Sequence, residues 1–309
     1  VLTGTPIENR VLDLWSIFDF LMPSYLGNYF SFRSEYENSI VMDDNDALNR
    51  LVKKITPFVL RRTKEKVLKD LPNKIETIQI ASMEKEQKKI YDALLKQVRD
   101  MLTSNDNKNS KIDILASLTR LREVCVDPNL YVDNYKGKSC KLDLLMEIVP
   151  KYISEGHKIV IFSQFASIFP SISKLLNENN IKHFILTGQT EALKRVEMAT
   201  SFNEHDSDEK VFLVSLKAGG TGLNLVGADI VIHLDPWWNY AVEEQATDRL
   251  HRIGQTKAVN VIKMVVENSI EQKVIELQKI KKDIASKIIQ NDTDNIEKMS
   301  VDDIAFLLE

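Results

Sequence analysis

The sequence predicts an α/β fold built on a parallel β-sheet with helices on both faces, together with helical insertions and a C-terminal helical segment. Beyond about residue 139, short apolar runs alternate with amphipathic stretches of helical length, as strands joined by helical crossovers do. The runs are apolar throughout, which is typical of strands buried on both faces. Five such strands are expected, at residues 158–163, 183–187, 211–215, 229–234 and 259–265.

The first part of the chain is expected to be helical. Apolar residues recur with helical spacing over residues 12–21 and again over 48–55, with interruptions at Pro23 and Gly27. Pro72 then ends this segment, because proline has no backbone N–H to donate within a helix.

Between the helical part and the alternating part, the pattern changes twice. Residues 75–81 alternate apolar and polar side chains, as a strand or an extended crossing would. A second helical block is expected over 83–126, interrupted by a polar loop at 103–111. Near the C-terminus, one apolar stripe over 274–288 predicts a long helix, and residues 300–303 resemble a capping box that opens a final short helix.

Composition narrows the class of protein. The 309 residues include 43% hydrophobic side chains but no run long enough to span a membrane. Cys125 and Cys140 form no CxxC pattern and the five histidines lack zinc-site spacing, so we expect neither a disulfide framework nor a structural metal. We expect an intracellular protein with no membrane partner, located in the cytoplasm or nucleoid of a prokaryote or in the nucleus of a eukaryote. Because the chain opens with Val1 in what reads as the end of a strand, we also expect it to be part of a longer polypeptide.

Candidate binding residues follow the expected strands. In an open parallel sheet, ligands bind beyond the carboxyl ends of the strands, so these loops are the places to search. Three of them carry polar or glycine-rich segments, namely Ser163-Gln164, residues 216–225 and residues 235–239.

The middle loop is rich in glycine. Gly219, Gly220 and Gly222 surround Thr221, and Lys217 lies just upstream. Glycine lets backbone N–H groups approach an anion closely, as phosphate-binding loops require. The same cluster could also be a tight strand-to-helix turn without a ligand. Its position after a central strand favours a phosphate.

The third loop leads into a helix that Asn239 is expected to N-cap. Gln245, Arg249 and Arg252 are spaced to fall on one face of this helix. An isolated pair of arginines is usually solvated, but these follow directly on a strand-end loop. Because a guanidinium stays charged and pairs with phosphate oxygens, the pair suits the charge on a transferring phosphoryl group. We expect both arginines to face a cleft at the carboxyl edge of the sheet.

Three other features do not indicate sites. The segment 137–139 (GKS) looks like the end of a P-loop, but the pattern GxxxxGK[ST] needs glycine where the chain has Val132. Asp235 has no second carboxylate beside it, so we expect no metal ligand in this chain. Trp237 and Trp238 are expected to pack against other side chains rather than to stack on bases.

These segments closely resemble motifs of the Swi/Snf-type DNA-dependent ATPases of helicase superfamily two, and the resemblance extends over nearly the whole chain. The matching segments are VLTGTPIEN at 1–9 (motif III), LRRTKEKVLKDLP at 60–72 (the link between lobes), IVIFSQF at 159–165 (motif IV), LTGQT at 186–190, SLKAGGTGLNL at 215–225 (motif V) and EEQATDRLHRIGQ at 243–255 (motif VI). Motifs V and VI together are very specific, whereas the other segments are weak alone.

The resemblance implies two RecA-like lobes with helical insertions, ATP in the cleft between them and duplex DNA gripped across both. It implies that ATP and Mg²⁺ are held mainly by an N-terminal lobe outside this chain. The expected domains are the end of lobe 1 with a helical protrusion (1–74), a linking strand and helical insertion (75–138), the RecA-like lobe 2 (139–266) and a C-terminal helical brace (267–309).

The resemblance also implies roles for single residues. Gln245, Arg249 and Arg252 match catalytic positions of motif VI, with the arginines as arginine fingers. No residue matches a metal ligand. The other matches are nucleotide binding by Gly222 and Asn224, DNA-backbone contact by Ser163, Gln164, Gly188, Thr190, Lys217, Gly220 and Thr221, and coupling of nucleotide state to DNA grip by Thr3 and Thr5.

The chain departs from the family pattern at four positions. Tyr240 stands where proline is common, and Leu250 where alanine is usual. Thr187 and Gln189 stand where aspartate and serine are frequent, which weakens the phosphate role of that loop.

The sequence therefore predicts the C-terminal motor half of an ATP-driven double-stranded-DNA translocase of the chromatin-remodelling type. We expect ATP hydrolysis in the full-length protein and none in this part alone, which lacks a P-loop and a Walker B motif. The net charge of −4 does not favour a nucleic-acid partner, but a local basic groove can outweigh it. Expected partners are double-stranded DNA, the N-terminal lobe of the same polypeptide and DNA-bound proteins as remodelling targets. Two alternatives stay open: a strand-separating helicase, and a non-catalytic DNA- or protein-docking module.

Overall fold

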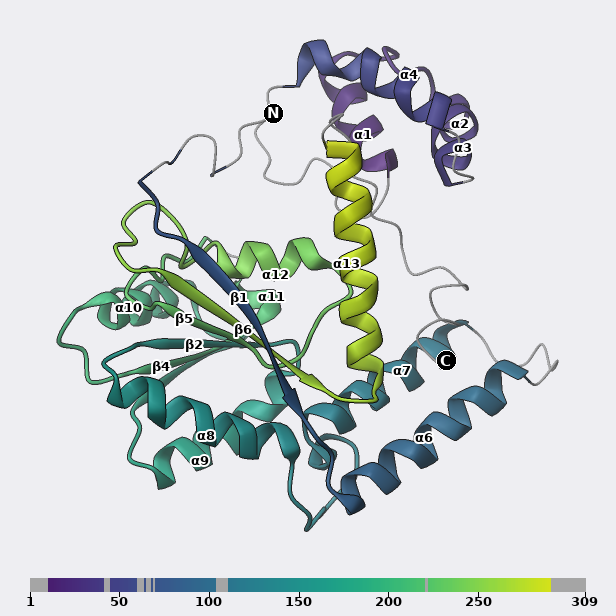
Figure 1. Cartoon of the computed structure of the whole chain (residues 1–309). Helices are drawn as coiled ribbons and strands as arrows, with labels where there is room; N and C mark the ends of the chain where they lie inside the picture. Colours follow the sequence, from purple (N-terminus) through teal and green to yellow (C-terminus); the bar gives the residue numbers. More distant parts are fainter. Residues whose placement is uncertain are drawn as a thin grey trace. The chain divides into compact units, whose positions relative to one another are not determined.

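The computed structural model describes residues 11–41, 45–59, 64, 68, 70–103, 111–219 and 222–289, which form two compact units (Figure 1). The larger unit comprises Leu68–Trp238 and Val242–Ile275. The smaller unit comprises the described residues before Leu68 together with Asn239–Ala241 and residues 276–289. None of the described helices is long and apolar enough to cross a membrane.

The smaller unit is helical where it is described, as its apolar periodicity predicts. Gly27 adopts a positive φ of 80° between the first two helices, a conformation that favours glycine. Phe18, Phe32, Tyr36 and Leu51 are buried in its own apolar core. Its elements are α1 (Val11–Leu21), α2 (Tyr29–Phe32), the π-helix η1 (Arg33–Glu37), α3 (Asn38–Val41), α4 (Asn45–Ile55) and the 3₁₀-helix η2 (Thr56–Phe58).

The larger unit contains a six-stranded sheet in the order β1-β6-β5-β2-β4-β3, in which every neighbouring pair is parallel. The predicted α/β fold with a parallel sheet is confirmed. The segment expected as a strand or an extended crossing is the edge strand β1. The strands are β1 (Lys74–Ala81), β2 (Ile159–Ser163), β3 (His183–Leu186), β4 (Val211–Ser215), β5 (Ile230–His233) and β6 (Val259–Val266).

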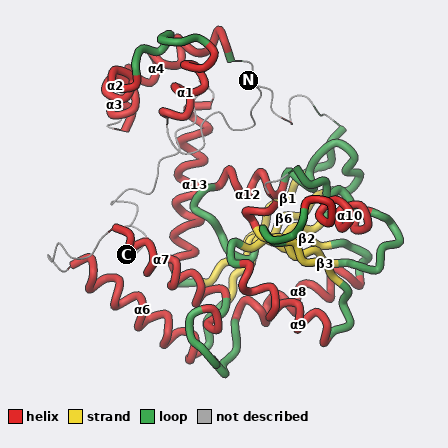
Figure 2. Tube along the Cα trace, turned by 180° about the vertical axis from the view of Figure 1, so that it is seen from behind, coloured by secondary structure: helices red, strands yellow, loops and turns green. Residues whose placement is uncertain are grey.

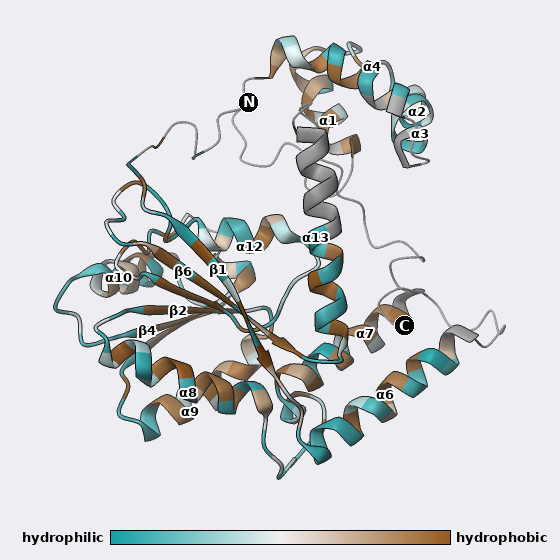
Figure 3. Cartoon of the chain, viewed as in Figure 1, coloured by the Kyte–Doolittle hydropathy of each residue, from teal (hydrophilic) through white to brown (hydrophobic). Residues whose placement is uncertain are grey.

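Helices cover both faces of this sheet, because successive side chains of each strand point to opposite sides. Ile159 and Ile161 of β2 share one apolar cluster with helices α8 (Cys140–Ser154) and α9 (Phe169–Glu178). Val160 and Phe162 share the other with α10 (Ala192–Asn203) and α12 (Tyr240–Thr247). Figure 2 shows the strands between these helices from behind, and Figure 3 shows the central strands in the hydrophobic colours.

The remaining helices are an insertion and a long C-terminal element. The insertion consists of α6 (Lys85–Thr103) and α7 (Lys111–Val126), which pack against each other. They correspond to the helical block predicted over 83–126 with an interruption at 103–111. A short helix α11 (Leu216–Gly219) follows β4, and α13 (Ile270–Ile289) follows β6. The capping box expected at 300–303 lies outside the described residues.

Candidate nucleotide and DNA site

The carboxyl ends of β2, β4 and β5 meet at one edge of the sheet, because the strands are parallel and in register. Ser163 pairs with Ser215, and Phe162 pairs with His233. The loops that begin one or two residues later therefore start side by side. This edge carries the segments in which the sequence predicts DNA contacts.

A buried ion pair organises two of these loops. Arg122 of α7 is fully buried, and its Nη2 lies 3.4 Å from Oδ2 of Asp235, which follows β5. The same nitrogen donates to the carbonyl oxygen of Pro236 at 2.7 Å, and Nη1 donates to Oε1 of Gln164 at 2.7 Å. Asp235 in turn accepts from the hydroxyl of Ser163 at 2.6 Å. One guanidinium therefore joins the ends of β2 and β5.

Aromatic rings surround this guanidinium. Its Cζ atom lies 4.6 Å from the ring centroid of Trp238, 5.0 Å from that of Trp237 and 5.4 Å from that of Phe165. The two tryptophan rings lie 4.4 Å apart. The sequence predicted packing roles for these tryptophans, and in this structure they hold a buried cation rather than a purely apolar neighbour.

Burial governs the electrostatics of this pair. Loss of water raises the pKa of Asp235, and the nearby Arg122 opposes that shift together with the hydrogen bond from Ser163. Burial also lowers the pKa of Arg122. Each charge depends on its partner, because an isolated charge at this depth would lose its solvation without compensation.

Ser163 and Gln164, the two DNA-contact candidates after β2, differ in their exposure to solvent. Ser163 is only 1% exposed, and its hydroxyl is engaged inside the network. Gln164 is half-buried at the edge, and Lys217 on α11 is exposed. Of Ser163, Gln164 and Lys217, the last two are therefore accessible to a ligand.

Gly188 and Thr190 lie in a short turn after β3. The hydroxyl of Thr190 accepts a hydrogen bond from the backbone N–H of Thr187 at 3.1 Å. The hydroxyl of Thr187 accepts one from the backbone N–H of Gln189 at 3.3 Å. Arg195 donates to the carbonyl oxygens of Thr190 at 2.7 Å and Gly188 at 3.0 Å. The two residues that depart from the family pattern here still form a closed turn.

The structure describes the glycine-rich loop, residues 216–225, except for Gly220 and Thr221. Gly222 is exposed with a φ of 61°, and among the described residues, its own chain neighbours aside, no atom lies within 4 Å of the position that its Cβ would occupy. Asn224 is exposed, and its carbonyl oxygen accepts from the side chain of Asn203 at 2.8 Å. An open positive-φ glycine of this kind can turn its backbone N–H toward an anion.

The segment with the candidate catalytic residues differs from the predicted helix. Asn239 caps α12 as expected, since its side chain accepts from the backbone N–H of Ala241 at 3.1 Å. However, α12 ends at Thr247, so Arg249 and Arg252 lie in the turns after it and do not share a helical face with Gln245. The backbone leaves the helical pattern there, as Arg249 N–H bonds to the carbonyl oxygen three residues back.

Hydrogen bonds of neighbouring residues locate the turn that carries these arginines. The turn carrying them returns to the amino ends of the strands: His251 Nε2 donates to the carbonyl oxygen of Pro72 at 2.8 Å, just before β1 begins. Gln255 donates to the carbonyl oxygen of Ala228 at 2.8 Å, just before β5 begins. The backbone of this turn therefore lies toward the amino ends of β1 and β5, and the cleft expected for the two arginine side chains stays a prediction. Both arginines are half-buried.

The two most family-specific segments are nevertheless in direct contact. The backbone N–H of Leu225 donates to the carbonyl oxygen of Arg249 at 2.9 Å. Gln255 also donates to Val226 at 3.2 Å and to Leu250 at 3.4 Å. The arginine-bearing turn is thus hydrogen-bonded to the end of the glycine-rich loop.

A buried polar cluster underlies α12. Glu243 is 2% exposed, lies 2.9 Å from the ammonium group of Lys263, and accepts from the backbone N–H of Trp237 at 2.6 Å. His233 stands 3.0 Å from the hydroxyl of Thr247, and burial lowers the pKa of this histidine to about 4. The imidazole is therefore neutral near pH 7.

A second buried ion pair anchors the start of α13. Lys141 of α8 lies 2.7 Å from Glu271, and both side chains are fully buried. Glu271 also accepts from the backbone N–H of Val266 at 3.0 Å, and burial raises its pKa. Neither ion pair was predicted. Such residues are spaced far apart in the chain, so no local pattern reveals them.

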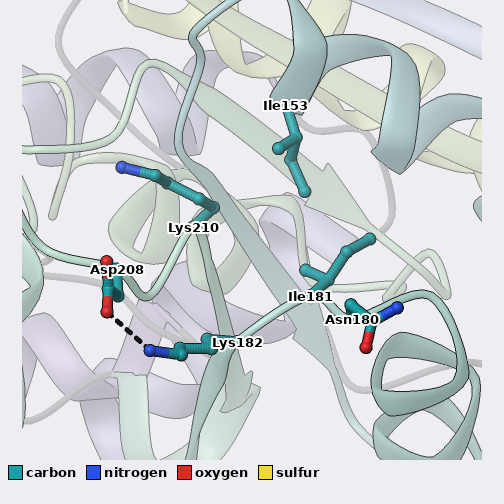
Figure 4. A pocket seen from close by; sticks show the side chains of 6 residues that line it. All are labelled: Ile153, Asn180, Ile181, Lys182, Asp208 and Lys210. Atoms are coloured by element: carbon teal, nitrogen blue, oxygen red, sulfur yellow. Dashed lines mark hydrogen bonds and ion pairs between the residues drawn. The ribbon is translucent and has the colours of Figure 1, made fainter.

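Several predicted residues lie outside the described part of the chain, namely Thr3, Thr5, Gly220 and Thr221. Among the described residues, no group of three or more His, Cys, Asp or Glu side chains could hold a metal ion. Cys125 and Cys140 are buried free thiols. A pocket lined by Asn180, Lys182 and Asp208 opens near the amino ends of β3 and β4, apart from the loops described above (Figure 4).

Comparison with known proteins identifies the family. A family model described as SNF2-related domain matches residues 1–130, and one described as Helicase conserved C-terminal domain matches residues 140–254. An uncharacterized ATP-dependent helicase of Mycoplasma genitalium is 37% identical over all of this chain, which spans 29% of that protein.

More distant relatives agree with this assignment. The mouse SWI/SNF-related matrix-associated actin-dependent regulator of chromatin subfamily A member 1 is 33% identical over 94% of this chain and 29% of its own length. The solved Sulfolobus solfataricus SWI2/SNF2 ATPase core in complex with dsDNA is 35% identical, with a TM-score of 0.63 over all of this chain and 66% of that one. The chain therefore belongs to the SNF2-related, Swi/Snf-type family of helicase superfamily two.

Proposed function

We propose that this chain is the C-terminal motor part of an ATP-dependent translocase on double-stranded DNA. It supplies arginine side chains to a nucleotide that a second lobe of a longer polypeptide holds. The names of the relatives support ATP use, and the solved relative bound to double-stranded DNA supports the choice of partner. The chain spans less than a third of the curated relatives, so the activity belongs to the longer protein.

The observation that carries this proposal is the hydrogen bond between Leu225 and Arg249. This backbone bond supports the proposal, because Leu225 directly follows Asn224 and lies three residues after Gly222, the two nucleotide-binding candidates. Arg249 and Arg252 bring two permanent positive charges to the phosphates, and the open backbone at Gly222 brings N–H groups. Such a set suits an anion better than an apolar ligand.

The arginines act on the charge of the transition state. During phosphoryl transfer, negative charge spreads over the oxygens of the γ-phosphate, and an arginine finger that meets it contributes on the order of a thousandfold or more in rate. Mg²⁺, which neutralises charge on the same phosphates, is assigned to the second lobe, together with the phosphate cradle.

The location of the arginine turn suggests that two surfaces divide the work. With the arginine turn near the amino ends of β1 and β5, the second lobe approaches across residues 248–255. The carboxyl edge, with Gln164 and Lys217, then stays available for the DNA backbone. Phosphate contacts carry little sequence information, so binding is expected to be largely independent of DNA sequence and to weaken with salt.

Replacement of Arg252 by alanine in the full-length protein tests the proposal. We expect duplex-stimulated ATP turnover to fall by about a thousandfold or more, while ATP affinity stays within a few-fold, because the lost interaction belongs to the transition state. Turnover is measured with saturating duplex DNA, and ATP affinity with a fluorescent nucleotide analogue.

The exposed Arg120 of α7 offers a matched control, since Arg120→Ala removes the same charge from a surface helix. It should leave both quantities unchanged. Turnover retained in Arg252→Ala would remove that arginine from the proposed role.

A further inference from the structure

Arg122 is a fully buried charge on the helical insertion, and in the sequence it belongs to none of the family motifs. We propose that Arg122 is a positioning residue for DNA: it binds the side-chain oxygen of Gln164 and so turns the amide NH₂ group outward as a donor to the DNA backbone. This inference rests on the proposed function, because it names how one accessible side chain of the DNA edge is oriented.

The chemistry of the two groups sets this orientation. A guanidinium only donates hydrogen bonds, whereas a glutamine amide has an accepting oxygen and a donating nitrogen. The bond of 2.7 Å from Arg122 Nη1 therefore requires the amide oxygen of Gln164 to face inward. The nitrogen, with two hydrogens, is left on the other side. Phosphate oxygens accept such hydrogens.

The rest of the network prevents Gln164 from changing this arrangement. Its backbone N–H lies 3.2 Å from both carboxylate oxygens of Asp235, so the residue is held at its backbone as well as at its side chain. Asp235 is itself held by the hydroxyl of Ser163. Ser163 thus supports the contact from inside the protein.

Arg122 is equally constrained. Nη2 donates to Pro236, and Trp238 lies 4.6 Å from the centre of the guanidinium. A planar, forked cation can bond to two partners while rings lie against it, and an ammonium group has no such plane. Arg122→Lys is therefore not expected to restore the orientation.

Gln164→Glu in the full-length protein tests the orientation directly. A carboxylate still accepts the bond from Arg122, so the network and the fold are kept, but no outward donor remains. We expect the affinity for a labelled DNA duplex to fall about tenfold or more, as loss of a hydrogen bond to a charged group predicts.

The exposed Gln97 of α6 provides the control, because Gln97→Glu adds the same negative charge to a surface helix. It should bind the duplex like the wild type. If Gln164→Glu also binds like the wild type, the positioning role is overturned. If the wild-type protein itself fails to bind duplex DNA, the proposed function fails instead.

A double variant separates positioning from simple stabilisation. Arg122→Met with Asp235→Asn removes both buried charges together, so neither is left unpaired. We expect this variant to fold, to bind the duplex as weakly as Gln164→Glu, and to lose little more when Gln164→Glu is added. Wild-type affinity in the folded double variant would show that Arg122 only stabilises the fold. If the double variant does not fold, Arg122→Lys takes its place, because it keeps a buried positive charge beside Asp235 but has no planar fork to hold Gln164. Wild-type duplex affinity in Arg122→Lys would overturn the positioning role.

Discussion

His233 lies at the carboxyl end of β5, where burial keeps water away from its imidazole ring. The ring stacks on Phe162 with centroids 5.6 Å apart, and Nε2 lies 3.0 Å from the hydroxyl of Thr247. Protonation would place a buried positive charge near the ammonium group of Lys263. Although Glu243 opposes the shift, loss of solvation is the larger effect and lowers the pKa of His233 to about 4.

This histidine makes stability depend on pH. Below its ordinary pKa near 6.5 the unfolded chain binds a proton, whereas the folded chain does so only near pH 4. The free energy of unfolding should therefore fall as pH drops from 6.5 to 4, by about 3 kcal/mol from this group. Denaturant titrations at several pH values, followed by Trp237 and Trp238 fluorescence in a Trp15→Phe background, measure it. His233→Gln should flatten this part of the profile, and an unchanged profile would contradict the assignment.

Lys217 gives a residue-scale test of DNA contact. It is exposed after β4, so its ammonium group can reach a phosphate without rearrangement of the fold. Lys217→Ala should weaken duplex binding at low salt and reduce the slope of log affinity against log salt by about 0.9, as loss of one phosphate contact predicts. Lys174→Ala, which removes a lysine that is 77% exposed on α9, is the matched control. An unchanged slope in Lys217→Ala would exclude the contact.

At the scale of elements, buried polar groups determine where helices begin and end. The first turn of α13 is anchored by Glu271, which binds Lys141 of α8 and the backbone N–H of Val266. Tyr91 of α6 accepts from the backbone N–H of Ile270 at 2.8 Å. Two elements distant in sequence, α8 and α6, thus fix the starting point of this helix together with the end of β6. The ladder of β6 ends at this same place.

The ion pair under α13 should therefore behave as a unit. Lys141→Met leaves the carboxylate of Glu271 buried without its partner, and we expect a loss of about 3–5 kcal/mol in the free energy of unfolding. Lys141→Met with Glu271→Gln should recover most of it, since the amide oxygen can still accept from Val266. Urea denaturation of the three proteins checks this. Equal loss in both variants would mean that the ammonium group contributes through packing alone.

At the scale of the whole molecule, the proposed motor needs a phosphate cradle, and the sequence predicts none within this chain. Its motifs offer arginines and a glycine-rich loop, whereas the phosphate cradle is assigned to a second lobe. We expect this chain alone to show no ATP turnover above background with duplex DNA, and the longer polypeptide to turn ATP over. A phosphate-release assay compares this chain alone with the longer polypeptide. The Arg252→Ala variant of the longer polypeptide gives the background rate. Turnover by this chain alone would require a nucleotide site within it.

Much of the fold could be predicted because it depends on local pattern. Uninterrupted apolar runs at 159–162 and 211–214 lie in strands buried on both faces, and the alternating run at 75–81 forms an edge strand. The cap at Asn239 was also predictable, since it satisfies backbone groups two residues away. Each of these features depends on neighbours in the chain.

The tertiary structure alone decided which polar groups are buried together. The sequence by itself determined the parallel sheet, the order of helices and strands, and the family motifs, because these follow from spacing along the chain. It could not determine that Arg122 meets Asp235 and Gln164, or that the turn with Arg249 returns to the amino ends of the strands. Those contacts join residues more than 40 positions apart or depend on where α12 ends, and only the packing of α7 and α12 on the sheet brings them about.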